Sequence, residues 1–457
     1  MKYYFCGIGG VGMSSIAEFL KFKGYQVCGS DRAFDLGDNL KTKRKLEEEG
    51  IALFKQDGNG VDNSIDCFVV STAVESKILD VQKALSLNIS IKKRAEVLAE
   101  ILHAHKGIAI GGTSGKTTIT AMTGHILYEN KYDPVVINGG TFINTYNNNS
   151  DSNVILGNGD YCVIESDESD STIELYNPVI SVVSNISLDH KPIEELMPLF
   201  SDFVKRTRHG TVINIDCQYA QTLKNLHSNT ITFSCDAQKN ATLTATDIQK
   251  TQKGITFKVN SISVELQVPG LHNVQNALAA IGASMLAGIS LEDCAKALST
   301  FKGTKRRLER IGTAHDITVY DDYAHNPEKI AASLRTLQNP PHRLFSVFQP
   351  HGFAPLRLMK EDLIKSFIDN TTPQDFLIFP EVFYQGGTVT KDISSKDIVN
   401  ALNMQNRQAF FFENRADITD FIVQNIKHGD TVAVMGARDN TLTDLAKQIF
   451  EIIKEKP

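Results

Sequence analysis

The stretch GIAIGGTSGKTT spans residues 107–118 and decides the fold of the middle of the chain. Its apolar residues 108–110 predict a buried strand, and Ile119, Met122 and Ile126 then recur at helical spacing. Between strand and helix, glycines let backbone N–H groups approach phosphate oxygens, and the helix N-terminus adds partial positive charge. The pattern predicts a loop that binds the phosphates of a nucleotide.

The predicted cofactor-binding residues are the loop itself, namely Gly112, Thr113, Ser114, Gly115, Lys116, Thr117 and Thr118. The Lys116 ammonium is suited to neutralising the β- and γ-phosphates, and the Thr117 hydroxyl is suited to Mg²⁺. The loop is shorter than the usual phosphate loop, because Ile110 stands where that pattern has its first glycine. The alternative, an accidental glycine turn, is disfavoured by the strand and helix on either side.

The composition is that of an ordinary globular protein. The 457 residues predict two to four domains, and 42% of them are hydrophobic and 22% charged. A net charge of -6 disfavours a nucleic-acid partner, and no apolar run approaches the roughly 18 residues of a membrane helix. The seven cysteines are scattered without a CxxC motif, which indicates reduced thiols in a cytoplasmic protein.

The N-terminal segment begins like a dinucleotide-binding βαβ unit. A strand over Tyr3–Cys6 runs into a GxGxxG loop, and an acidic residue follows the next strand. NAD is one ligand that fits this pattern, and the pyrophosphate of a UDP-sugar is another. A third strand over 67–70 ends in Ser71 and Thr72, which could face a ligand or simply cap a helix. The predicted substrate-binding residues of this segment are Gly7, Gly9, Gly12, Ser30, Asp31, Ser71 and Thr72.

Two polar segments follow apolar strands of the nucleotide-binding part. The run ESDESD covers residues 165–170, and SNISLDH covers 184–190. Carboxylates at such strand ends are typical Mg²⁺ ligands beside phosphates, so Thr117, Glu165 and His190 are the predicted metal ligands. The alternatives are a solvated acidic loop and a structural role for His190.

The rest of the chain predicts an Ala-rich helix and a third α/β segment. His272, Asn273 and Asn276 open the helix, where Asn273 could instead be an N-cap. The basic run KRRLE at 305–309 marks a predicted domain junction. The predicted strands beyond it cover residues 316–320, 344–348, 376–379 and 431–435, and an amphipathic helix closes the chain.

Eight motifs taken in order resemble the Mur ligases, ATP-dependent amide-forming enzymes of peptidoglycan synthesis. They are GIGGVGMS, GTSGKTT, ESDESD, NISLDH, GLHNVQNA, KRRLE, DDYAHNP and FQPH. The resemblance covers nearly the whole chain and implies an α/β protein of three domains. These are a Rossmann-like domain at 1–105 for a UDP-sugar, a P-loop ATPase-like domain at 106–308 for ATP, and a Rossmann-like domain at 309–457 for the incoming amino acid.

The resemblance also implies the reaction. ATP phosphorylates a carboxylate, and an amine displaces phosphate from the acyl phosphate; in the most similar type, L-alanine is joined to UDP-N-acetylmuramate. The implied cofactors are ATP and Mg²⁺. The implied partners are the UDP-sugar acid and an amino acid, with no nucleic acid or membrane; the oligomeric state stays open. The implied catalytic residues are Lys116, Glu165, His190, Arg307 and His325.

Further residues take roles from the same resemblance. His272, Asn273 and Asn276 match the adenine-binding segment, and Arg307 and Asp322 match residues that reach the nucleotide when the third domain closes. His325 and His351 line the acceptor side. Lys205 is the candidate for the carbamylated lysine of several Mur ligases.

Departures from the alanine-adding pattern leave the acceptor open. Ser114 and Asn326 replace histidines, and Gly352 and Pro355 stand where that type has arginines. An arginine suits a bidentate grip on a carboxylate, so either Arg357 replaces the missing contact or a larger or differently charged amine is added. The alternatives kept open are a murein-peptide recycling ligase, a ligase with another acceptor, an inactive binding protein and, less favoured, an NAD-dependent oxidoreductase.

Overall fold

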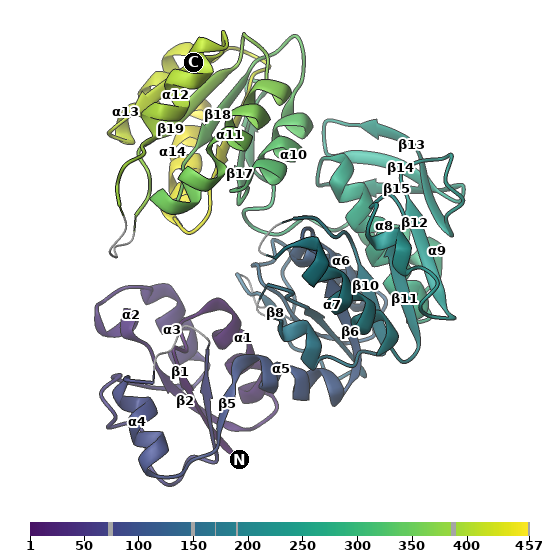
Figure 1. The fold of residues 1–457 in the computed structure, drawn as a ribbon, viewed down its shortest axis with the longest axis vertical. Coiled ribbons are helices and arrows are strands. Elements are labelled where there is room, and N and C mark those ends of the chain that lie inside the picture. The colour runs from purple at the N-terminus through teal and green to yellow at the C-terminus, as the bar shows by residue number, and fades with distance from the viewer. Residues whose placement is uncertain (72–75, 148–150, 170, 189–190, 385–389, 456–457) are drawn as a thin grey trace. The chain divides into compact units, whose positions relative to one another are not determined.

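The computed structural model describes residues 1–71, 76–147, 151–169, 171–188, 191–384 and 390–455. Helices alternate with strands that form three sheets (Figure 1), which confirms the predicted α/β class. By internal contacts the chain divides into two compact units. One comprises Met1–Gln249, Thr256–Gln267 and Asn273–Lys302, and the other Lys250–Ile255, Val268–His272 and Gly303–Pro457. The predicted domain boundaries at 105/106 and 308/309 stay predictions.

The first sheet is wholly parallel, with the order β3-β2-β1-β4-β5. Its strands are β1 (Lys2–Cys6), β2 (Gln26–Ser30), β3 (Ala52–Phe54), β4 (Cys67–Val70) and β5 (Ile91–Lys93). The helices of this segment are α1 (Val11–Phe22), α2 (Arg32–Asp35), α3 (Leu40–Glu48), α4 (Leu79–Ser86) and α5 (Arg94–His103). Alternate residues of β1 face opposite cores: Tyr3 and Phe5 pack with α1 and α5, while Tyr4 packs with α4. The glycine loop therefore leaves the carboxyl edge of a central strand.

The second sheet has ten strands in the order β15-β14-β13-β12-β11-β10-β6-β9-β7-β8. They are β6 (Lys106–Gly111), β7 (Val135–Ile137), β8 (Val154–Ile155), β9 (Tyr161–Glu165), β10 (Ile180–Val183), β11 (Gly210–Asn214), β12 (Thr230–Ser234), β13 (Leu243–Lys250), β14 (Ile255–Val259) and β15 (Ile262–Leu266). The helices are α6 (Lys116–Glu129), α7 (Ile193–Lys205), α8 (Leu271–Leu286) and α9 (Leu291–Leu298), with short 3₁₀ turns at Thr172–Leu175 and Ala220–Leu223. Strand β6 lies between its parallel neighbours β9 and β10, so residues that follow these three strands gather at one edge.

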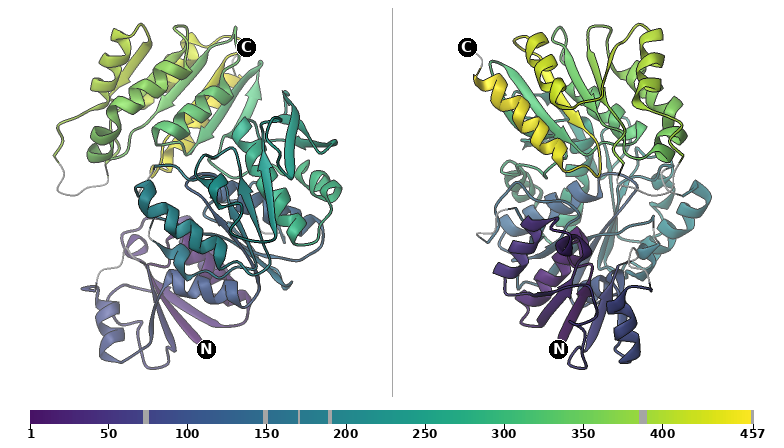
Figure 2. Two further views of the ribbon diagram at one scale, coloured as in Figure 1. Left: turned by 45° about the vertical axis from the view of Figure 1, so that its right-hand side comes forward. Right: turned by 90° about the vertical axis from the view of Figure 1, so that its left-hand side faces the viewer.

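The third sheet has the order β16-β17-β21-β18-β19-β20, in which only β16 is antiparallel to its neighbour. Its strands are β16 (Glu309–Ala314), β17 (Ile317–Asp322), β18 (Leu344–Phe348), β19 (Phe376–Pro380), β20 (Gln408–Phe412) and β21 (Thr431–Met435). The helices are α10 (Pro327–Leu337), α11 (Phe353–Asn370), α12 (Ser395–Met404), α13 (Ala416–Asn425) and α14 (Thr441–Glu455). Helices α10, α11 and α12 cover one face and α13 and α14 the other (Figure 2).

Two simple features complete the fold. All seven cysteines are free thiols, and five of them are buried. Among the helices of the described residues, none has both the length and the apolar character needed to cross a bilayer.

Candidate functional site

The phosphate loop joins β6 to α6, as predicted. Gly112 and Gly115 adopt φ values of 135° and 86°, which favour glycine. A Cβ at Gly112 would lie 2.0 Å from the Ser184 hydroxyl oxygen, so no side chain fits there. Helix α6 begins at Lys116, and Thr118 is buried in its first turn. The loop therefore carries backbone N–H groups and a helix N-terminus at the sheet edge, as an anion site requires.

Lys116 is held by a buried carboxylate. Its ammonium donates to Glu168 Oε2 at 2.7 Å and to the Gly112 carbonyl at 2.7 Å. The Glu168 side chain is only 4% exposed; burial raises its pKa, and Lys116 opposes that shift. The interpretation of the acidic run as a solvated loop is wrong for Ser166 and Glu168, which are both buried.

Glu165 joins the end of β9 to the start of α6. Its Oε2 accepts from the Thr117 hydroxyl at 3.2 Å, and its Oε1 accepts from the Gly139 N–H at 2.5 Å. Two of the three predicted metal ligands thus lie together, and both offer oxygen atoms, which Mg²⁺ prefers. The third, His190, lies outside the described residues, and within the described part no group of three His, Cys, Asp or Glu side chains is placed to hold a metal.

Two residues with no predicted role shape the loop. Asn185 Oδ1 accepts from the Thr113 hydroxyl at 2.7 Å and from the Ser114 N–H at 2.8 Å. The Ser184 hydroxyl donates to the Ser114 carbonyl at 2.8 Å. Both residues follow β10, the neighbour of β6, and their position in the SNISLDH segment at 184–190 was the available signal.

The predicted adenine-binding residues divide between the two units. Asn273 is buried inside α8, which begins at Leu271, so its interpretation as an N-cap is wrong. Asn276 donates to Asn273 Oδ1 at 3.1 Å, and a Cβ at Gly115 would lie 2.5 Å from Asn276 Oδ1. The helix therefore brings Asn276 against the phosphate loop. His272 belongs to the other unit, where burial lowers its pKa to about 4.

The N-terminal glycine loop is fixed by the end of β2. The Gly7 N–H donates to the Ser30 carbonyl at 2.8 Å, and the Gly9 N–H donates to Asp31 Oδ2 at 2.7 Å. Asp31 Oδ1 accepts from the Ala33 N–H at 2.8 Å. Each carboxylate oxygen of Asp31 thus has a backbone partner, so Asp31 shapes the loop.

Four further predicted residues of this segment are Ser30, Ser71, Thr72 and Gly12. The Ser30 side chain is fully buried, and its hydroxyl donates to Asp80. Ser71 follows β4 and is half-buried, whereas Thr72 lies outside the described residues. A Cβ at Gly12 would meet Arg94 Nη1 at 3.2 Å. The sequence prediction missed Arg94, the first residue of α5, which also lowers the pKa of Asp167.

Two histidines meet at the edge of the third sheet. The ring centroids of His325 and His351 lie 5.5 Å apart. His325 Nδ1 lies 2.9 Å from the Tyr323 carbonyl, which can only accept, so Nδ1 donates. Burial, aided by the Lys329 charge, lowers the pKa of His325 to about 4. Both predicted acceptor-side histidines are therefore together, and His325 is a neutral imidazole near pH 7.

Asp322 and Arg307 lie beside this pair. Asp322 is the last residue of β17 and not part of a loop, which corrects the predicted strand end at 320. Its buried carboxylate accepts from the Ser333 hydroxyl and from the Leu308 N–H, and burial raises its pKa. The Arg307 guanidinium lies 4.9 Å from the Tyr323 ring centroid.

Arg357 already has partners. Its Nε donates to Asp392 Oδ1 at 3.1 Å, and its Nη2 donates to the Thr390 carbonyl at 3.1 Å. A replacement of the missing acceptor-side arginines by Arg357 would require this pair to open. Lys205, at the end of α7, is exposed and lies 3.5 Å from Asp202.

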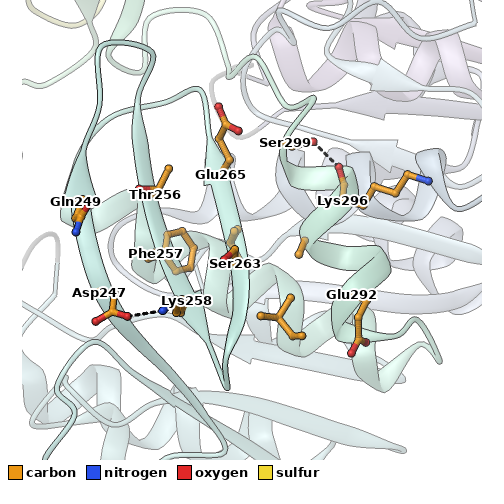
Figure 3. A pocket seen from close by; sticks show the side chains of 13 residues that line it. Asp247, Gln249, Thr256, Phe257, Lys258, Ser263, Glu265, Glu292, Lys296 and Ser299 are labelled. Atoms are coloured by element: carbon orange, nitrogen blue, oxygen red, sulfur yellow. Dashed lines mark hydrogen bonds and ion pairs between the residues drawn. The ribbon is translucent and has the colours of Figure 1, made fainter.

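A separate groove of about 630 Å³ lies between the β13–β15 strands and α9 (Figure 3). It carries both signs of charge, and Lys258 pairs with Asp247 across neighbouring strands at 2.9 Å. No predicted site residue lines it, and we assign it no ligand. Its lining is Asp247, Gln249, Thr256, Phe257, Lys258, Ile262, Ser263, Val264, Glu265, Glu292, Ala295, Lys296 and Ser299.

Comparison with known proteins covers the whole chain. Three family models match in order: the Mur ligase family catalytic domain over residues 2–106, the Mur ligase middle domain over 110–284 and the Mur ligase glutamate ligase domain over 306–438. A curated relative, the UDP-N-acetylmuramate–L-alanine ligase of Desulforamulus reducens, is 32% identical over 100% of this chain and 98% of its own.

Solved structures agree with these matches. The UDP-N-acetylmuramate–alanine ligase of Thermotoga maritima superimposes with a TM-score of 0.79 and 25% identity over 99% of each chain. A murein peptide ligase of Psychrobacter arcticus has a TM-score of 0.65 at 22% identity over 100% of this chain and 99% of its own, which shows the shared fold alone. With full-length similarity to curated ligases and all three domain models in order, the chain belongs to the Mur ligase family.

Proposed function

We propose that this chain is an ATP-dependent ligase that joins L-alanine to the carboxylate of UDP-N-acetylmuramate, in the cytoplasm, during peptidoglycan synthesis. The observation that carries the proposal is the convergence of the phosphate loop with Glu165 and Glu168 at one sheet edge. The choice of substrates rests on the activity named for full-length relatives. The free, mostly buried cysteines support a reducing compartment.

In this proposal the central loop handles ATP. The γ-phosphate takes the place of Glu168 on the Lys116 ammonium, and the loop N–H groups receive the remaining phosphate oxygens. Thr117 and Glu165, with His190 as the proposed third ligand, would hold Mg²⁺. That ion would supply charge neutralisation on the phosphate oxygens. We assign Asn276, which lies against the loop, to the adenosine side of the nucleotide.

The sugar nucleotide is proposed to bind at the N-terminal glycine loop. The N–H groups at the start of α1 would bind the pyrophosphate, while the Gly7 and Gly9 N–H groups fix the loop through their bonds to Ser30 and Asp31. Arg94 beside Gly12 adds a cation at the same helix start.

The reaction then proceeds in two balanced steps. A carboxylate oxygen of the sugar acid attacks the γ-phosphorus, the bond to the β-phosphate oxygen breaks, and ADP leaves. The amine nitrogen of the amino acid attacks the acyl carbon, a proton leaves the nitrogen, and the carbon–oxygen bond to phosphate breaks. The chain contributes by positioning the reactants and stabilising developing charge. His325, neutral with Nδ1 donating to Tyr323, presents Nε2 as an acceptor for an amine N–H.

Two alternatives make different predictions. A murein-peptide recycling ligase would prefer a peptide amine over free L-alanine. An NAD-dependent oxidoreductase has no use for Lys116 and Thr117, and membership of the Mur ligase family argues against it.

The test is phosphate release from ATP with UDP-N-acetylmuramate and a panel of amines, with the product checked by mass. We expect release only when both co-substrates are present, with L-alanine as the best amine. Release that depends on a peptide in place of L-alanine would favour the recycling ligase, and no release with any amine would overturn the proposal.

A further inference from the structure

The acceptor side of the third sheet needs a cation that Arg357 does not offer, because that arginine is paired with Asp392. In the register of the sheet, Met435 of β21 pairs with Asp322 on one side and with Phe348 on the other. His325, His351 and Arg438 each stand three positions beyond a member of this row, since 325 − 322, 351 − 348 and 438 − 435 all equal 3. The loop that follows the middle strand therefore brings Arg438 to the same edge of the sheet as the two histidines.

Building on the function proposed above, we propose that Arg438 binds the carboxylate of the incoming amino acid. It thus stands in for the arginines that the loop after His351 lacks.

Nearby carboxylates do not neutralise Arg438. Its neighbour Asp439 is buried and pairs with Arg415 at 2.5 Å. Asp439 also accepts from the Thr441 N–H at 2.9 Å. Arg438 itself is exposed, and across the described ranges its side chain forms no hydrogen bond or ion pair. A guanidinium with open donors matches a carboxylate from outside the chain.

The backbone conformation at Arg438 is one that glycine adopts more easily than arginine. Its φ is 64°, in the left-handed region where glycine is most favourable. The loop is held in place, because Arg306 Nη2 donates to the Gly436 carbonyl at 2.7 Å and the Asp439 N–H donates to the Ala437 carbonyl at 2.8 Å. Strained conformations of this kind gather at binding sites, and a fixed loop limits the entropy lost when the side chain binds.

The electrostatics of the edge agree with this assignment. Burial lowers the pKa of His351, and the nearby Arg438 charge lowers it further. With His325 also neutral near pH 7, neither imidazole carries a charge that would compete for the carboxylate. Arg438 is the cation whose charge acts on His351, whereas Lys329 and Arg307 act on His325.

The test compares acceptors with and without a carboxylate. Arg438→Gln should raise the KM for L-alanine about 10- to 100-fold, because a charge-assisted pair is lost, and Arg438→Lys should restore part of the loss. For L-alaninamide, which has no carboxylate, wild type and Arg438→Gln should have the same KM. The KM values for ATP and the sugar acid should not change, and Arg407→Gln, at the opposite sheet edge before β20, is the matched control.

A second measurement does not need turnover. Phenylglyoxal should modify Arg438 in the wild-type chain, and mass spectrometry should show that L-alanine protects it while L-alaninamide does not, with sugar acid and a non-hydrolysable ATP analogue present. Equal protection by both amines, or an L-alanine KM that rises less than about threefold in Arg438→Gln, would overturn this proposal. Failure of all ligation would instead overturn the proposed function, and the protection pattern would still decide the role of Arg438.

Discussion

The phosphate loop and the sheet edge that carries His325, His351 and Arg438, here called the acceptor edge, lie at equivalent places in their sheets. They differ in whether their cation is paired with a carboxylate of the chain. Both lie where parallel strands end, β6, β9 and β10 in one case and β17, β21 and β18 in the other. At the loop, Lys116 is paired with Glu168. At the acceptor edge the histidines are neutral, and Arg438 has no carboxylate partner in the part of the chain that the structure describes. If the substrates bind as proposed, ATP displaces Glu168 from Lys116, whereas the carboxylate of the amino acid meets a cation without a carboxylate partner among the described residues.

The largest effect is expected from Lys116→Ala. Without the ammonium, charge on the transferring phosphoryl group loses about 3–4 kcal/mol of stabilisation, so kcat/KM should fall about 100- to 1000-fold. Phosphate release measures it, and circular dichroism checks the fold, because Glu168 loses its counter-charge. Lys106→Ala, at the other end of β6, is the control. Turnover close to wild type would remove the nucleotide role of the loop.

Next in size is the metal dependence of Glu165→Gln. If Glu165 and Thr117 hold Mg²⁺, the loss of a charged oxygen ligand should raise the Mg²⁺ concentration for half-maximal activity at least about 10-fold. Glu174→Gln, exposed in the 3₁₀ turn after the acidic run, should titrate like wild type. An unchanged Mg²⁺ titration in Glu165→Gln would leave that carboxylate with only its structural role toward Thr117 and Gly139.

The pairing at the loop can be measured directly. A double-mutant cycle of Lys116→Met and Glu168→Gln, followed by denaturant unfolding without nucleotide, should give a coupling energy of about 1–3 kcal/mol. With a saturating ATP analogue the coupling should shrink, because phosphate replaces Glu168 as the partner. A coupling energy of zero would show that Lys116 and Glu168 do not stabilise each other. A coupling energy that the ATP analogue leaves unchanged would show that phosphate does not replace Glu168.

The sequence predicted the positions of strands better than the hydrogen-bond and ion-pair partners of side chains. Short apolar runs beside glycine or acidic residues placed β1, β6 and β21 within a residue or two, because these signals are local. The acidic run offered several carboxylates, and only the packing of the strand end selects Glu168 for Lys116. Asp31 likewise stood at the expected position, but hydrogen bonds to the backbone decide what its oxygens do.

The sequence did not point to Arg438, because its position at the acceptor edge depends on the order of the strands in the sheet. The last strand of the chain, β21, inserts between β17 and β18. Arg438 therefore reaches the same sheet edge as His325 and His351, although about a hundred residues separate them in sequence. Arg357 was the natural candidate from spacing, and its pairing with Asp392 is a tertiary contact that no spacing reveals.

The smallest expected effect tests whether the His325 imidazole at the acceptor edge is neutral. The pKa of His325 is lowered to about 4 by burial, with contributions from Lys329, His351 and Arg307, against about 6.5 when unfolded. As pH falls from 6.5 towards 4, the unfolded chain binds a proton that the folded chain refuses, so stability is full above pH 6.5 and declines below it. Between pH 7 and 5.5 this should cost about 1 kcal/mol.

His325→Gln should remove that part of the acid sensitivity, and denaturant unfolding at the two pH values measures it. His315→Gln, in the exposed turn between β16 and β17, should keep the wild-type difference. If His325→Gln loses as much stability on acidification as wild type, the fold does not lower the pKa of His325, and the imidazole gains its proton as the pH falls through about 6.5. Arg438 would then share the acceptor carboxylate with a second cation, and the contrast with the phosphate loop would weaken.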